Sequence, residues 1–265
     1  MTAGGPPLRV LDGPLLLDFD GPVCAVFAGY PAERIAADLI ETIARKSGGR
    51  GSALDHPPSK SGGRLGGRED SGPPDQRNAA ARHPSELPMA ERDPLAVLRW
   101  AGKNCARDTL IAVEEALSAA ELRAVVTAEP TPHGHDLILT AAACGLPVAV
   151  VSNNSAPAIR AYLAAHGLAT HIAVVVGRPY ANPARMKPDP RPILEAARAL
   201  DASPDACTFV GDSVTDVKAA RAAGVRVVGY ANRPAKLRAL AGADAVVTSM
   251  GQLTVASRAP GRRAE

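Results

Sequence analysis

The spacing of apolar residues along this chain changes at about residue 130. Before this point, apolar side chains recur on one helical face in three segments, 31–46, 94–103 and 108–128, and this spacing predicts amphipathic helices. After it, short apolar runs alternate with helical segments of about ten residues. Such alternation is typical of right-handed β-α-β units and of a parallel sheet.

The apolar runs predict the strands of that sheet. Leu15, Leu16 and Leu17 form a short run that fits a strand buried on both faces, and 8–10 is expected to add a short edge strand. Further strands are expected at 147–152, 171–176, 208–211, 225–230 and 245–247, with helices at 131–144, 156–166, 192–200, 214–223 and 234–241. We therefore expect an α/β fold: a Rossmann-like parallel sheet core with an inserted small α-helical cap.

The same pattern divides the chain into domains. Residues 1–29 and 130–256 are expected to form the core, 30–129 the cap, and 257–265 a disordered tail. Within the cap, the 42 residues of 47–88 contain eight Gly, six Pro and six Ser and no aromatic residue. Such a segment cannot bury enough apolar area to offset its ordering entropy, which predicts a disordered insertion. A tolerated loop insertion is favoured over a regulatory or basic tether.

Composition and charge restrict the function classes. The 265 residues are 46% hydrophobic, as in soluble globular proteins, and no apolar run approaches the roughly 18 residues of a membrane span. No secretory signal is visible, and four scattered cysteines lack metal or redox spacing, so a cytoplasmic location is expected. The net charge of +3 equals the basic surplus between Arg45 and Glu86, which argues against a general nucleic-acid-binding surface.

Polar residues follow three of the predicted strands. Because the carboxyl ends of parallel strands share one edge of the sheet, these residues are expected to meet there. A lysine in the loop between the second and third of these strand ends can join them. The set is Asp18, Asp20, Ser152, Asn153, Lys187, Asp212 and Asp216.

This combination of residue types suits phosphoryl transfer at a metal-dependent site. One carboxylate can take the phosphoryl group, while a second protonates the leaving oxygen and later deprotonates water. Clustered carboxylates repel one another unless a hard cation such as Mg²⁺ lies among them. A hydroxyl and free backbone N–H groups at 152–153 would hold the phosphate, and Lys187 would offset negative charge.

Four motifs resemble, in order, those of the haloacid dehalogenase-like (HAD) superfamily: Asp18-Phe-Asp-Gly-Pro-Val, Ser152-Asn, Lys187-Pro-Asp-Pro and Gly211-Asp-Ser-Val-Thr-Asp. The resemblance covers residues 11–30 and 130–250, and the helical insertion lies where that family has its C1 cap. One departure is Pro22, where the family usually has Thr; proline removes a hydroxyl and a backbone donor from the turn.

The resemblance implies a role for each residue. Asp18 would be the nucleophile that forms an aspartyl-phosphate, and Asp20 the general acid and base. Ser152 and Asn153 would bind phosphate, and Lys187 would stabilise the nucleophile and the phosphate. The Mg²⁺ ligands would be Asp18, the main-chain carbonyl of Asp20, Asp212 and, directly or through water, Asp216.

The expected function is that of a Mg²⁺-dependent phosphatase acting on a small phosphorylated metabolite, as a monomer or homodimer, with no nucleic-acid or membrane partner. A dehalogenase is disfavoured because it needs neither a metal nor the second acid. Two alternatives stay open: a sugar-phosphate mutase with the same residues, and a non-catalytic binding protein that uses the basic segment 45–86. The substrate is not identified by the sequence.

Overall fold

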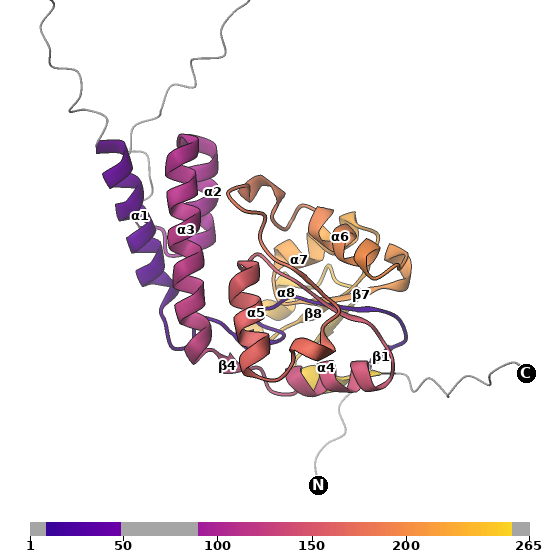
Figure 1. Ribbon diagram of the computed structural model, residues 1–265. Helices are drawn as coiled ribbons and strands as arrows, with labels where there is room; N and C mark the ends of the chain where they lie inside the picture. The colour runs from indigo at the N-terminus through magenta and orange to yellow at the C-terminus, as the bar shows by residue number, and fades with distance from the viewer. Residues whose placement is uncertain (1–8, 49–89, 256–265) are drawn as a thin grey trace, which may run out of the picture.

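The computed structural model describes residues 9–48 and 90–255 and consists of an α/β core with a layer of long helices beside it (Figure 1). Most of the predicted insertion 47–88 and all of the tail 257–265 lie outside the described residues. Ser47 and Gly48, which the sequence assigns to that insertion, belong to helix α1.

The core contains a six-stranded sheet in the order β6-β5-β2-β7-β8-β9, and every neighbouring pair is parallel. Its central strand is β2, where Leu16 pairs with Ala149 on one side and Phe209 on the other. The predicted parallel α/β fold is therefore confirmed. The strands are β2 (Leu15–Leu17), β5 (Val148–Val151), β6 (Val174–Val176), β7 (Thr208–Gly211), β8 (Arg226–Tyr230) and β9 (Ala245–Val247).

Helices cover both faces of this sheet. Side chains alternate across a strand, so Leu15 and Leu17 enter one buried cluster and Leu16 enters the cluster on the opposite face. All three leucines are fully buried, as their sequence predicts. The core helices are α4 (Gly134–Ala143), α5 (Ala156–Ala165), α6 (Arg191–Ala199), α7 (Val214–Ala222) and α8 (Pro234–Ala239).

Three helices form the cap: α1 (Ala32–Gly48), α2 (Pro94–Asn104) and α3 (Arg107–Ala124). They lie side by side next to the core (Figure 1) and share a buried cluster that includes Ile35, Leu98 and Leu117. The Asp93 side chain accepts a hydrogen bond from the Leu95 N–H and so begins α2.

Several short elements differ from the sequence expectation. The first strand, β1 (Arg9–Leu11), does not lie at an edge of the main sheet but pairs with β10 (Leu253–Val255) in a separate two-stranded sheet. The antiparallel pair of β3 (Cys24–Ala25) and β4 (Glu129–Pro130), where the chain enters and leaves the cap, was not predicted. Each of these two strands has only two residues, which is too short to show a periodicity in the sequence.

Three boundaries are also corrected. The helix predicted at 131–144 begins only at Gly134. The helix predicted at 108–128 ends at Ala124 and continues as the 3₁₀ turn Val125–Thr127. The strand predicted at 171–176 begins at Val174, after the 3₁₀ turn Ala169–His171. Among the described helices, none is both long and apolar enough to cross a membrane.

Candidate active site

Asp18 lies directly after the central strand and is buried. Its Oδ1 accepts a hydrogen bond from the Phe19 N–H at 2.7 Å and contacts the Lys187 ammonium at 3.0 Å. Burial and the carboxylate of Asp216 raise the pKa of Asp18 to about 8, although Lys187 opposes the shift. Without a further cation, this carboxyl therefore keeps its proton up to a pH well above the range in which an aspartate usually ionises.

Lys187 lies at the centre of the site. Only 1% of its surface is exposed, and its Nζ lies 3.0 Å from Asp18 Oδ1 and 2.6 Å from Asp216 Oδ1. The same ammonium donates to the Val151 carbonyl at 2.9 Å. Burial lowers the pKa of Lys187, but the two carboxylates outweigh this effect and raise it, so the side chain is charged.

Asp212 and Asp216 follow strand β7 at the start of α7. Ser213 is the N-cap of this helix, and Asp216 Oδ2 accepts from the Asp212 and Ser213 N–H groups at 3.1 and 3.0 Å. A Cβ at Gly211 would lie 2.5 Å from the Asp216 Cβ, so the close approach of strand and helix requires glycine. Burial raises the pKa of Asp216, but Lys187 and the hydrogen bonds from Ser213 outweigh it, and the net pKa is below the usual range.

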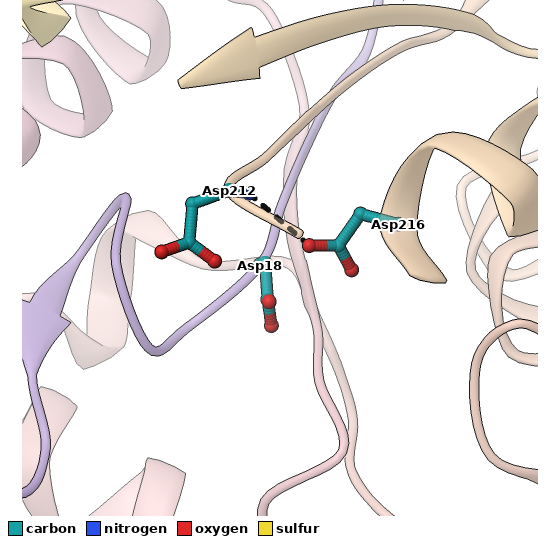
Figure 2. A group of neighbouring side chains, drawn as sticks. All are labelled: Asp18, Asp212 and Asp216. Carbon is teal, nitrogen blue, oxygen red and sulfur yellow. Dashed lines mark hydrogen bonds between the residues drawn. The ribbon is translucent and has the colours of Figure 1, made fainter. Parts of the chain in front are cut away.

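The carboxylates of Asp18, Asp212 and Asp216 lie close together (Figure 2), and one oxygen from each lies within 4.8 Å of the others. Among the described residues, no donor reaches the main-chain carbonyl of Asp20. Hard cations prefer this all-oxygen donor set. The residues present therefore fit a Mg²⁺ ion.

Asp20 lies beyond the strand end, where its Oδ1 accepts from the Val26 N–H at 3.0 Å. Burial raises the pKa of Asp20 to about 6, the Val26 hydrogen bond opposes this shift, and the charge on Asp212 adds to it. The next residue, Gly21, has φ of 109°, and a Cβ there would lie 2.4 Å from the Asp212 carboxylate. Both the left-handed backbone and the close contact require glycine.

The turn at Pro22 obtains a hydroxyl from another segment. Thr131, directly after the strand β4 that returns from the cap, donates its hydroxyl to the Gly21 carbonyl at 2.5 Å, and its N–H donates to the Val23 carbonyl at 3.1 Å. A distant threonine thus supplies a hydroxyl to the turn in which Pro22 has none.

The loop after β5 differs from the expectation in one respect. The Ser152 N–H is not free for a ligand, because it donates to the Val176 carbonyl at 2.9 Å and extends the pairing of β5 with β6. The Asn153 side chain holds the backbone of Lys187: its Oδ1 accepts from the Lys187 N–H at 2.9 Å and its Nδ2 donates to the Lys187 carbonyl at 3.2 Å. Within the described residues, the Asn153 N–H has no acceptor and stays available.

The sequence did not point to Lys236, which lies on α8 and forms an ion pair with Asp212. Lys236 lies shortly after the end of strand β8, at the same edge of the sheet as the other polar residues. Its position after a strand is the feature of the sequence that could have indicated it. Burial raises the pKa of Asp212, and Lys236 partly offsets this shift.

The sequence also did not point to a buried ionic cluster between cap and core. The Arg178 guanidinium lies 2.7 Å from Glu114 and 2.7 Å from Glu121, both on α3, and donates to the Asn153 carbonyl at 2.8 Å. Glu121 also accepts from the Ser155 N–H at 2.9 Å. Burial lowers the pKa of Arg178, but the two carboxylates outweigh it and raise the pKa. This cluster fixes α3 to the loop that follows β5.

The fold and the ordered strand ends define the class of the protein. A family model described as haloacid dehalogenase-like hydrolase matches residues 15–224, and the chain belongs to this family.

Curated relatives named phosphoglycolate phosphatase align over part of the chain. The protein from Escherichia coli K12 is 37% identical over 98 residues, which are 37% of this chain and 38% of that protein. The protein from Salmonella typhi is 33% identical over 131 residues, 49% of this chain and 51% of that protein. The chain thus spans at most about half the length of the curated relatives described here.

Solved structures share the fold over nearly the whole chain. CbbY from Rhodobacter sphaeroides in complex with phosphate has a TM-score of 0.60 at 19% identity, covering 93% of this chain and 97% of that chain. β-Phosphoglucomutase from Clostridium difficile has a TM-score of 0.54 at 16% identity, covering 93% and 94%. At these identities the likeness concerns the fold alone.

Proposed function

We propose that the chain is a Mg²⁺-dependent phosphomonoester hydrolase that acts on a small phosphorylated metabolite through an aspartyl-phosphate on Asp18. The observation that carries the proposal is the position of the Lys187 ammonium, within 3.0 Å of both Asp18 and Asp216 at the end of the central strand. A buried cation between two carboxylates lowers the charge repulsion that an incoming phosphate would meet.

Asp18 is suited to attack because its two oxygens differ. Oδ1 is fixed by the Phe19 N–H and Lys187, whereas no hydrogen bond from the described residues reaches Oδ2. Oδ2 forms the new bond to phosphorus, and the bond between phosphorus and the ester oxygen breaks. The negative charge that develops on the phosphoryl oxygens is met by Lys187, by the Asn153 N–H and by the Ser152 hydroxyl, which turns to the phosphate from the Asn154 Oδ1 to which it otherwise donates at 3.1 Å.

Asp20 moves the proton in both halves of the reaction. With its pKa raised to about 6, it can hold a proton for the leaving oxygen close to neutral pH. The resulting carboxylate then takes a proton from water, and the water oxygen attacks the phosphorus of the aspartyl-phosphate. The bond to Asp18 breaks, inorganic phosphate leaves, and both aspartates return to their starting states.

Asp18, Asp212, Asp216 and the Asp20 carbonyl would hold Mg²⁺. When bound, the ion would neutralise the carboxylates and polarise the phosphoryl group. Every proton transfer and bond exchange described above is made by residues of this chain.

The first experiment is an assay of the purified protein against a panel of phosphorylated metabolites, with Mg²⁺ and with EDTA. Phosphoglycolate belongs in the panel because the partly aligned relatives carry that name. A hexose 1-phosphate separates two outcomes, since released phosphate indicates hydrolysis and an isomerised sugar phosphate indicates mutase chemistry.

The test variant is Asp18→Asn, which should abolish turnover of an aryl phosphate while the thermal unfolding curve stays in place. The matched control is Asp136→Asn, because Asp136 lies on α4 with its side chain 75% exposed and should not affect turnover. Activity of Asp18→Asn within tenfold of the unmodified protein would contradict the proposal.

A further inference from the structure

A cavity of about 610 Å³ lies between the cap and the core, apart from the carboxylates of the active site. One wall comes from α2 and the start of α3, and the other from the loop 181–189 that precedes α6. Figure 1 shows this loop reaching up beside α2. The volume is within the range of small-molecule sites in proteins.

The cavity is lined by three basic side chains: Arg99, Lys103 and Arg107. None of them has a carboxylate of the described residues within ion-pair distance. The single lining carboxylate is Asp189, and it is already paired with Arg191 at 2.5 Å. The excess of positive charge is therefore not balanced by a carboxylate in the part of the chain that the structure describes.

Two of the three cations are held in place by backbone carbonyls. Arg99 donates to the Lys187 carbonyl at 3.1 Å, and Arg107 donates to the Ala181 carbonyl at 2.6 Å. Each guanidinium has five N–H donors, so donors remain for a ligand. Arg99 is also partly buried, and an unpaired charge in such a position costs free energy that a bound anion would recover.

Apart from Asn182, the remaining lining is apolar or small. Leu110 and Met186 are buried in the cap cluster, and Pro183 and Pro188 complete this surface. A ligand that matches the whole cavity combines an apolar body with several negative charges.

We propose that this cavity binds a small organic polyanion, an apolar body carrying at least two phosphate or carboxylate groups, at a site separate from the reacting carboxylates. The anionic groups lie between Arg99, Lys103 and Arg107, and the body contacts Leu110 and Met186. The site does not depend on the proposed phosphatase activity. It adjoins the reaction centre through Arg99, which holds the backbone of Lys187.

The test is calorimetric titration of the full chain with α,β-methylene-ADP in EDTA, where the probe cannot be turned over. Adenosine and pyrophosphate, each carrying half of the proposed features, serve as comparison ligands and should bind at least tenfold more weakly. Affinity should fall as salt is raised, because the contacts are between exposed charges.

Lys103→Gln and Arg107→Gln should each weaken binding about tenfold or more, because each removes a charged hydrogen-bond donor. Arg99 is left intact because it contacts Lys187. The matched control is Arg160→Gln, an exposed arginine on α5 outside the cavity, and it should change the affinity less than twofold. Thermal unfolding of each variant verifies that it is folded.

Ser152→Ala distinguishes the cavity from the reaction centre. Its affinity for the probe should match that of the unmodified protein. Loss of binding in Ser152→Ala with retention in Lys103→Gln and Arg107→Gln would place the probe at the reaction centre and overturn the proposal. Absence of binding at millimolar probe would overturn it as well.

Discussion

Replacing Arg178 by methionine should strongly destabilise this protein. The guanidinium is fully buried and donates to Glu114, Glu121 and the Asn153 carbonyl, with every distance between 2.7 and 3.2 Å. Without it, the buried carboxylates of Glu114 and Glu121 on α3 have no counter-charge among the described residues. Breaking a buried ion pair in this way costs about 3–5 kcal/mol, which is a large part of the ~5–15 kcal/mol that keeps a domain folded.

The measurement is urea unfolding followed by circular dichroism, with thermal unfolding as a second readout. For a chain of this size the expected loss lowers Tm by roughly 10 °C. The matched control is Arg191→Met, because Arg191 also pairs with a carboxylate at 2.5 Å but its side chain is 54% exposed. This surface pair is screened by solvent, so its loss should shift the unfolding curve far less than the loss of Arg178 does.

A compensated variant separates lost charge balance from lost packing. Arg178→Met combined with Glu114→Met and Glu121→Gln removes both charges and keeps an acceptor for the Ser155 N–H. It should recover at least half of the stability lost by Arg178→Met. A loss below about 1 kcal/mol in Arg178→Met would refute the reasoning that the cluster holds cap and core together.

Three predictions concern the reaction and its metal. Asp20→Asn should lower kcat/KM for an alkyl phosphate by about 10²–10⁴-fold, because the leaving oxygen then has no acid to protonate it. With nitrophenyl phosphate it should give a burst of one nitrophenol per enzyme, because the second step needs the base. Unchanged turnover of both substrates would contradict the role of Asp20 as general acid and base. Because the pKa of Asp20 is raised to about 6, its acid form is lost above that pH, and kcat/KM for the alkyl phosphate should fall about tenfold per pH unit there; a flat profile to pH 8 would be inconsistent. Mg²⁺ at 100 times its Kd should raise the free energy of unfolding by about 2.7 kcal/mol, and Asp212→Asn should remove this effect. Lys236→Met should reach the same stabilisation at a lower Mg²⁺ concentration, because the ammonium no longer competes for Asp212. Equal Mg²⁺-dependent shifts of the unfolding curve in all three proteins would argue against this site.

The ordered strand ends were visible in the sequence because the constraint behind them is general. Leu15–Leu17 predicted a strand buried on both faces, and a parallel sheet brings the residues after its strands to one edge. Asp18, Lys187, Asp212 and Asp216 therefore lie together, although up to 198 positions separate them. Their roles in catalysis stay predictions until the variants are measured.

The backbone details of the site could not be predicted in the same way. The Ser152 N–H was expected to be free, but the pairing of β5 with β6 extends one residue further and uses it. Thr131, just after strand β4, reaches the turn at Pro22 across a separation of more than 100 residues in the sequence. Such hydrogen bonds depend on the register of each strand pair and on the residue at which each strand ends. The spacing of apolar and polar residues along the sequence specifies neither.

The sequence by itself determined the class of fold and the edge of the sheet where reactive residues gather, because apolar periodicity and strand ends are local properties of the chain. Only the tertiary structure decided that Arg178 meets two glutamates of α3, that Lys236 pairs with Asp212, and that three basic residues line one wall of a cavity between the cap and the core. These contacts join elements that pack across the cap and core. Their partners follow from how helices and loops lie against one another in space, and no local spacing in the sequence encodes that arrangement.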